Sequence, residues 1–294
     1  MNKNIAHILP QGEQMKKLNQ SPFKFLEGPV WCKMRKTLFF SDPLAQTIIA
    51  MNSDGAFTTI QHDSGYVNGM CLNSESRLVV CKMETGRVEE VDPDTGKTIR
   101  IISSGYQNRP FNATNDVVCD RAGGLYVTDP IFTYGPGTQE VEATYYVMPD
   151  GQTKRVATNS IKPNGLALSR DGKRLFIDDT LSTNVWCYDV GKDGTLSNPK
   201  VFCHVQPPED ISTLPPIQQY GEADGLKVDS QGNVYVTTFN GIQIFNACGA
   251  LLGTIPMPAD ETAANVAFGG EQFTTLYITA RASLYSISVR IPGL

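Results

Sequence analysis

Residues 115–129 contain Asn115-Asp116-Val117-Val118-Cys119-Asp120 and then Gly124-Leu125-Tyr126-Val127-Thr128-Asp129, a unit that recurs along the chain. In each copy a polar doublet opens an apolar run, a turn follows, and a second strand-like run ends near Thr, Ser or Asp. The other copies begin at Glu27-Gly28, Asn68-Gly69, Asn164-Gly165, Asp224-Gly225 and Asn265-Val266. Successive starts lie about 40 to 60 residues apart, which is the spacing of propeller blades. The pattern predicts an all-β fold, a six-bladed β-propeller in a single domain over 1–294 with a short N-terminal extension over 1–20.

The rest of the chain fits this prediction, with a few irregular segments. A helical period is hinted at only between Glu13 and Asn19. The loops 131–142 and 206–220 interrupt the rhythm and are expected to be lids, binding loops or plain surface excursions. Because an unpaired edge strand is a liability, we expect a strand near one terminus to close the ring by pairing with the last blade.

The bulk composition argues against several classes of partner. The net charge is −5 and no basic stripe is present, so nucleic acid is not expected. No apolar run reaches the length of a membrane span. No apolar stretch follows the N-terminal charges, so we expect no signal peptide and a cytoplasmic protein, although a chain already trimmed of its leader would read the same way. The seven cysteines show no CxxC spacing and are expected to be small buried thiols.

At four of the six starts the opening residue is expected to place an oxygen atom at a common point on the axis of the channel. These residues are Glu27, Asn115, Asn164 and Asp224. Two carboxylates and two amide carbonyls form a hard oxygen set that suits one divalent cation, Ca²⁺ first, with Mg²⁺, Mn²⁺ or Zn²⁺ possible. Asn-Gly and Asp-Gly are also common turn dipeptides, so the pattern alone leaves a turn role open.

Histidine chemistry is not expected at this point of the fold. The three histidines are His7, His62 and His204, and none opens a copy of the unit. A zinc site built on histidine, or an acyl-transfer triad, therefore has no ligand or base in the right place.

Several segments resemble one known family. They are Glu27-Gly28-Pro29-Val30-Trp31, Pro163-Asn164-Gly165-Leu166-Ala167-Leu168, Asp224-Gly225-Leu226-Lys227-Val228-Asp229 and a closing stretch over 253–280. Taken in order, from about residue 23 to 287, they resemble the gluconolactonase, senescence-marker-protein and luciferin-regenerating-enzyme family. The resemblance implies a six-bladed propeller with one divalent metal, often Ca²⁺, in its channel, and hydrolysis of sugar lactones.

The resemblance also implies roles for single residues. Glu27, Asn164 and Asp224 match the family's metal ligands, and Asn115 matches an Asn that binds the metal or contacts the substrate. The run Cys81-Lys82-Met83-Glu84 departs from a Glu-His-Gly run that relatives often carry, which bears on the substrate rather than the metal.

We therefore predict a metal-dependent hydrolase that opens the ester of a small-molecule sugar lactone, as a monomer or weak homo-oligomer. Asp224 is the expected general base, with a metal-generated hydroxide that Asp224 only orients as the alternative, and Asn115 is expected to position the substrate. A phosphotriesterase-like hydrolase using the same site, or a non-catalytic propeller that serves as a binding module, are the competing interpretations.

The channel rim is expected to set specificity. The candidate substrate-binding residues are Asn68, Arg109, Tyr134 and Asn265, with Tyr66, Phe132 and Tyr220 in the same loops. Glu222 is a spare carboxylate two residues before Asp224 and is expected in a solvated loop rather than at the channel mouth.

Overall fold

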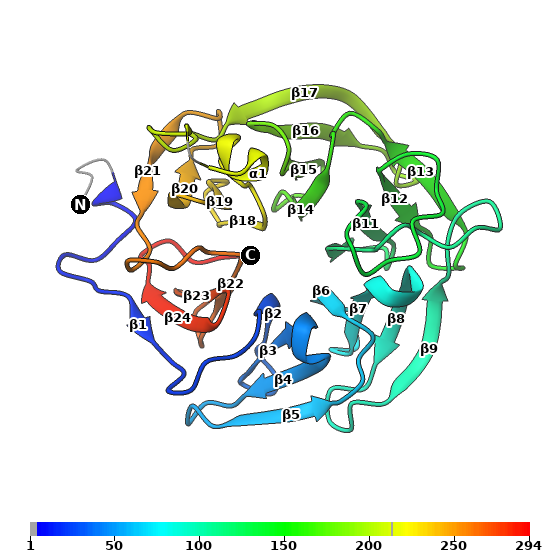
Figure 1. The fold of residues 1–294 in the computed structure, drawn as a ribbon, viewed down its shortest axis with the longest axis horizontal. Helices are drawn as coiled ribbons and strands as arrows, with labels where there is room; N and C mark the ends of the chain where they lie inside the picture. Colours follow the sequence, from blue (N-terminus) through cyan, green and yellow to red (C-terminus); the bar gives the residue numbers. More distant parts are fainter. Residues whose placement is uncertain (1–4, 213) are drawn as a thin grey trace.

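The computed structural model describes residues 5–212 and 214–294 and shows six four-stranded antiparallel sheets arranged around a central channel (Figure 1). This architecture confirms the predicted six-bladed β-propeller. In five sheets the first strand in the chain is the innermost and the following strands lie progressively farther from the axis, and in the sixth the outermost strand is β1 from the N-terminal segment.

The strands follow one another blade by blade. The first two sheets contain β2 (Glu27–Cys32), β3 (Thr37–Asp42), β4 (Thr47–Met51) and β5 (Phe57–Gln61), then β6 (Val67–Leu72), β7 (Leu78–Lys82), β8 (Arg87–Val91) and β9 (Thr98–Ser103). The next two contain β10 (Val117–Cys119), β11 (Leu125–Asp129), β12 (Ala143–Val147) and β13 (Thr153–Ala157), then β14 (Pro163–Leu168), β15 (Arg174–Asp179), β16 (Asn184–Val190) and β17 (Leu196–His204). The last two contain β18 (Leu226–Val228), β19 (Val234–Thr238), β20 (Gly241–Phe245) and β21 (Leu251–Ile255), then β22 (Asn265–Gly269), β23 (Thr275–Ala280), β24 (Ser283–Ser288) and β1 (Lys16–Lys17).

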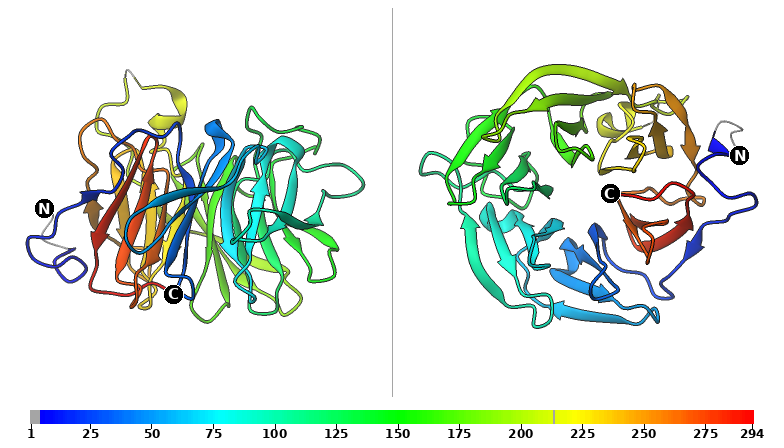
Figure 2. Two further views of the ribbon diagram at one scale, coloured as in Figure 1. Left: turned by 90° about the horizontal axis from the view of Figure 1, so that it is seen from below. Right: turned by 180° about the vertical axis from the view of Figure 1, so that it is seen from behind.

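Short helices occupy some of the connections. They are the 3-10 turns η2 (Pro43–Ala45) and η3 (Met83–Thr85) and the single-turn helix α1 (Pro216–Gln219). Figure 2 shows α1 projecting from one face of the ring, while the C-terminal residue lies at the other. Among residues 5–212 and 214–294 no helix has the length and apolar character needed to cross a bilayer.

The ring closes through its N-terminal segment, as predicted. β1 pairs antiparallel with β24, with Lys16 opposite Ser286 and Lys17 opposite Tyr285. The side chain of Asn19 supports this pairing, since its Oδ1 accepts a hydrogen bond from the backbone N–H of Leu284 at 2.8 Å. The helical period hinted at between Glu13 and Asn19 is wrong, because edge pairing with β24 satisfies this backbone better than an isolated turn of helix would.

The core lies between neighbouring sheets rather than on one side of each sheet. Middle strands such as β11 and β20 are buried along their whole length, whereas the outer strand β9 is largely exposed. Both faces of a middle strand pack against adjacent blades, which explains why these strands are nearly continuous apolar runs in the sequence. The prediction of buried thiols is right for Cys32, Cys81, Cys187 and Cys203, whereas Cys71 and Cys119 are half-buried and Cys248 is exposed. All seven cysteines are free.

The inner strands approach one another closely at their first residues. A Cβ atom on Gly28 would overlap the backbone carbonyl oxygen of Asn68, and one on Gly165 would lie 2.7 Å from the carbonyl oxygen of Asp224. Gly28 also has a φ of 51°, a left-handed conformation that favours glycine. The Gly of the recurring doublet therefore sets how near the polar residue before it comes to the neighbouring blade.

Gly28→Ala is expected to destabilise the protein by about 3 kcal/mol, from left-handed strain plus overpacking against backbone. Gly172→Ala is the matched control, since Gly172 has a φ of 70° but no atom within 4 Å of the added Cβ. The control is expected to cost only about 1 kcal/mol. Denaturant unfolding of both variants measures the difference, and equal losses would contradict the role given to Gly28.

Candidate active site

The polar residues that open the inner strands meet at one end of the channel. Because every blade starts with its inner strand, all six starts point to one face and all six ends to the other. Five of the six starts, all but Asn265, line a cavity of about 300 Å³. Its polar lining residues are Glu27, Asn68, Asn115, Asn164, Thr133, Tyr134, Thr180, Glu222 and Asp224. All four residues proposed from the sequence as metal ligands therefore lie in one cavity.

Asn164 and Asp224 come from neighbouring blades and are hydrogen-bonded to each other. Nδ2 of Asn164 donates to Oδ1 of Asp224 at 2.8 Å and to Oγ1 of Thr180 at 3.0 Å. The Thr180 hydroxyl in turn donates to the carbonyl oxygen of Ala223 at 2.8 Å. Because both bonds use the side-chain nitrogen of Asn164, its side-chain oxygen Oδ1 is the atom left to bind a ligand.

Glu27, the first residue of β2, is held by its own strand and by the neighbouring blade. Its Oε2 accepts a hydrogen bond from the backbone N–H of Gly28 at 3.0 Å and one from Nδ2 of Asn265 at 3.4 Å. Glu27 is almost fully buried. A buried carboxylate with only neutral donors beside it lacks a compensating positive charge.

The electrostatics of the cavity show the same deficit. Burial raises the pKa of Glu27 to about 7, and the negative charge of Asp116 adds to the rise. Burial and then repulsion from Glu27 raise the pKa of Asp224 well above its usual range. Two buried carboxylates that repel each other are unfavourable alone and become favourable when a cation lies between them.

The chemistry of the donor set fits a hard divalent cation. Glu27 and Asp224 supply charge, and the amides of Asn115 and Asn164 supply neutral oxygen. Asn115 is buried, and its side chain makes no hydrogen bond to any residue that the structure describes, so its amide is free to bind. In the described part of the chain no cluster of three His, Cys, Asp or Glu side chains has metal-binding geometry. The candidate set contains only two such residues, Glu27 and Asp224, because its other two members are asparagines.

Two of the four proposed substrate-binding residues line the cavity and two do not. Asn68 and Tyr134 line the cavity, and the ring of Tyr134 stacks on Tyr66 with centroids 4.5 Å apart. Asn265 lies behind the lining and contacts Glu27 instead. Arg109 lies outside the lining, where its Nη1 pairs with Oε1 of Glu140 at 3.3 Å and both side chains are exposed.

Sequence reasoning missed a set of lining residues that follow the second strand of a blade. They are Pro43 and Leu44 after β3, Met83 after β7, Thr133 after β11 and Thr180 after β15. The second strand is antiparallel to the inner one, so its end lies beside the inner strand's start. That rule predicts these positions from the repeat alone. Ile217 of α1 also lines the cavity, so part of the 206–220 loop covers this face.

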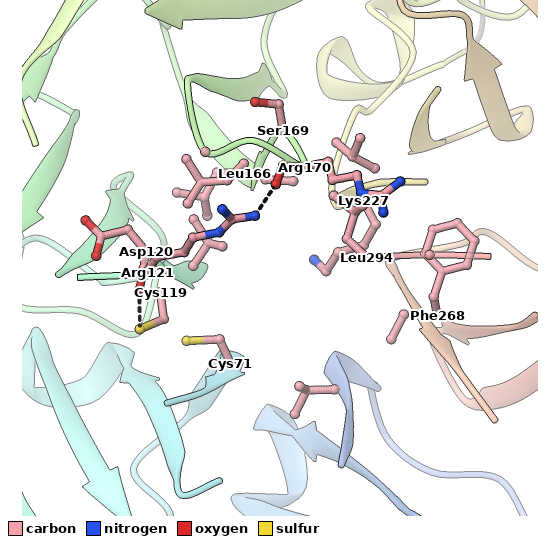
Figure 3. A pocket seen from close by; sticks show the side chains of 18 of the residues that line it. Cys71, Cys119, Asp120, Arg121, Leu166, Ser169, Arg170, Lys227, Phe268 and Leu294 are labelled. Carbon is pink, nitrogen blue, oxygen red and sulfur yellow. Dashed lines mark hydrogen bonds between the residues drawn. The ribbon is translucent and has the colours of Figure 1, made fainter. Parts of the chain in front are cut away.

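A second and larger cavity, of about 860 Å³, lies where the inner strands end (Figure 3). Lys227 lies there with its Nζ 3.9 Å from Oδ2 of Asp116, and Cys71 and Cys119 lie on adjacent inner strands. The guanidinium groups of Arg121 and Arg170 donate to backbone carbonyls. The charged groups of this larger cavity interact with other protein groups. The oxygen-bearing side chains that converge on one point are those of the smaller cavity.

The fold and the site together define a six-bladed propeller with an oxygen-lined cavity at one end of its channel. Residues 25–282 match the model of the SMP-30/Gluconolactonase/LRE-like region, so the chain belongs to that family. The predicted resemblance is thereby confirmed.

Individual relatives span nearly the whole chain. A gluconolactonase of Zymomonas mobilis is 27% identical over 299 residues, covering 93% of this chain and 81% of its own, and the pentonolactonase XacC of Haloferax volcanii is 28% identical over 258 residues, covering 86% and 80%. The structure of a gluconolactonase from Xanthomonas campestris superposes with a TM-score of 0.86 at 26% identity, covering 98% of this chain and 93% of that one. The calcium-binding protein regucalcin of Agrobacterium tumefaciens shares the fold, with a TM-score of 0.79 at 16% identity over 96% of both chains.

Proposed function

We propose that this protein is a metal-dependent lactonase that opens the ester of a sugar lactone. The observation that carries the proposal is the convergence of Glu27, Asn115, Asn164 and Asp224 on one buried cavity. Membership of a family that contains gluconolactonases and a pentonolactonase supports the reaction class. The calcium-binding relative supports Ca²⁺ as the ion.

The chemistry supplied by a bound divalent cation is polarisation of the lactone carbonyl and compensation of oxyanion charge. Glu27 and Asn164 hold the ion, and Asn115 orients the carbonyl or a ring hydroxyl. Asp224 accepts the proton of the attacking water, with its carboxylate held in place by Nδ2 of Asn164. Phe25, Leu44 and Met83 make much of the remaining wall apolar, which limits access of bulk water.

Chelation is expected to abolish lactone hydrolysis. Protein purified without chelator should carry about one divalent ion per chain, EDTA should lower the rate of glucono-δ-lactone hydrolysis by at least about 100-fold, and Ca²⁺ should restore it. Metal analysis and a pH-indicator assay measure the two quantities. A metal-free protein with unchanged lactone turnover, and no loss of heat stability in EDTA, would overturn the metal assignment.

The same assay separates the competing functions. A phosphotriester hydrolysed faster than any lactone, with the same dependence on the ion, would favour phosphotriesterase chemistry at this site. A protein that binds the ion and hydrolyses neither substrate would leave a propeller that serves as a binding module.

A further inference from the structure

The smaller cavity has a polar floor and an apolar mouth. The floor residues Glu27, Asn115 and Asn164 are buried. The apolar side chains of the lining are Phe25, Leu44, Met83, Phe132, Tyr134 and Ile217. Leu44 is 40% exposed and Tyr134 is 42% exposed, which places them at the opening, and Phe25, Phe132 and Ile217 are half-buried. Apolar surface is therefore open to water directly above the polar groups of the site.

The apolar mouth is assembled from segments that lie far apart in the sequence. Leu44 belongs to η2 after β3, Phe132 and Tyr134 follow β11, and Ile217 belongs to α1 ahead of β18. These segments belong to different blades, so the apolar lining is not the packing of one loop on itself. It is a surface that the ring of blades brings together around one opening.

Tyr134 is held in place by a second aromatic ring. Its ring stacks on that of Tyr66, with centroids 4.5 Å apart and planes 10° from parallel. Tyr66 has a φ of 56°, a left-handed backbone conformation that is unfavourable for a bulky residue. The stacked pair joins the loop before β6 to the loop after β11 and fixes the exposed ring at the mouth.

The other two aromatic rings of the mouth are each fixed by a cation. The ammonium of Lys162 lies 5.0 Å from the ring centroid of Phe132, and the guanidinium of Arg281 lies 5.8 Å from that of Phe25. Both cations also pair with a carboxylate, at 2.9 and 3.0 Å. Rings that are already ordered lose little conformational entropy when a ligand covers them.

The group that covers this surface belongs to the molecule bound on the polar floor. Floor and mouth line one cavity of about 300 Å³, which is far smaller than the surface that two proteins bury against each other. Apolar surface left open beside a reactive site is typical of a ligand-binding wall. A hydroxyl placed against Leu44 or Ile217 would lose water without gaining a hydrogen bond, whereas an alkyl or aryl group there would bury apolar area.

Resting on the proposed lactonase function, we propose that the substrate is a sugar lactone that bears an alkyl or aryl substituent. The lactone carbonyl and ring hydroxyls face the polar floor, and the substituent covers the apolar mouth at Leu44, Tyr134 and Ile217. The mouth then selects substituted lactones over the lactone of the free sugar by the apolar area that each buries.

The test compares glucono-δ-lactone with its 3-O-benzyl and 6-O-benzyl ethers on the Ca²⁺-loaded full chain. The value of kcat/KM for at least one ether is expected to exceed that for the parent lactone by at least about 30-fold. Calorimetry with the matching non-hydrolysable δ-lactams gives the same comparison without turnover. The benzylated lactam is expected to bind more tightly and with a more negative heat-capacity change, which marks burial of apolar surface.

Leu44→Ser is expected to reduce this preference about tenfold, and Leu44→Met, which keeps the side chain apolar, is expected to retain most of it. Ile131→Ser is the matched control, because Ile131 is 48% exposed and begins the loop that carries Tyr134 but does not line the cavity. It is expected to leave the preference unchanged. Because Leu44 and Ile131 are both exposed, neither serine variant is expected to unfold the protein.

Two results would overturn the proposed substituent while lactone hydrolysis stands. One is that neither ether is hydrolysed more efficiently than the parent lactone, and the other is that Leu44→Ser and Ile131→Ser change the preference equally. A protein that hydrolyses no lactone but binds a benzylated lactam more tightly than the parent lactam would overturn the lactonase and support the apolar mouth. Binding of no lactam would overturn both.

Discussion

Asp224→Asn is expected to lower kcat/KM for glucono-δ-lactone by at least about a thousandfold. The substitution keeps the shape of the side chain and its contact with Asn164, but it removes a ligand charge and the group that accepts the proton of water. It also relieves the repulsion from Glu27 that helps raise the pKa of Asp224. The chelated variant should therefore be at least as heat-stable as chelated wild type, which distinguishes a catalytic loss from misfolding.

The control for this prediction is Asp178→Asn. Asp178 is also fully buried, and its Oδ1 accepts a hydrogen bond from the backbone N–H of Gly165 at 2.9 Å, but it does not line the cavity. We expect its loss of activity to stay within about tenfold. Asp224→Asn protein that retains a tenth of wild-type turnover at saturating Ca²⁺ would remove Asp224 from the mechanism.

Glu27→Gln is expected to weaken Ca²⁺ binding by about 100-fold or more. One of two charged ligands becomes neutral, while its hydrogen bonds to Gly28 and Asn265 can persist through the remaining oxygen. Activity should therefore return in part at millimolar Ca²⁺, because the base Asp224 is intact. Calorimetric titration of chelated protein with Ca²⁺ measures the affinity, and the assay is repeated across Ca²⁺ concentrations.

Asp171→Asn removes the same charge from the other end of the channel, where Asp171 lines the larger cavity. It is expected to bind Ca²⁺ as wild type does. If Glu27→Gln binds Ca²⁺ as tightly as Asp171→Asn does, the ion lies elsewhere and Glu27 is not a ligand. Rescue of Asp224→Asn by Ca²⁺, as complete as that of Glu27→Gln, would contradict the separate roles given to the two carboxylates.

The repeat was enough to predict the architecture because each blade carries its own local signal. The turn after an apolar strand and the polar doublet before it recur in phase, so six weak patterns support one another. The same phase brings Glu27, Asn115, Asn164 and Asp224 to one cavity, since ring geometry alone decides where inner strands begin.

The channel rim was less predictable because long-range contacts decide it. Glu222 was expected in a solvated loop, yet Arg281, 59 residues farther along the chain, holds it at the cavity wall. Arg109 is drawn away from the lining by Glu140 in the neighbouring loop. Asn265 opens an inner strand as expected, but its side chain is turned to Glu27 rather than to the open space. No local sequence pattern predicts that Glu222 contacts Arg281, that Arg109 contacts Glu140, or that Asn265 contacts Glu27.

The closure of the ring by β1 has a consequence for how the chain matures. The segment around Lys16 and Lys17 is synthesised before the six inner strands, and its partners Tyr285 and Ser286 are synthesised after them. During synthesis the last blade is therefore incomplete and the first has no neighbour on one side, so nascent protein exposes apolar strand surface until translation of this region ends. Ile5, Ile8 and Leu9 pack in a hydrophobic cluster with residues of the last two blades, so they become buried only when those blades have formed. The first and last blades are therefore stabilised together, and a chain that stops before β24 lacks the β1–β24 pairing that joins them.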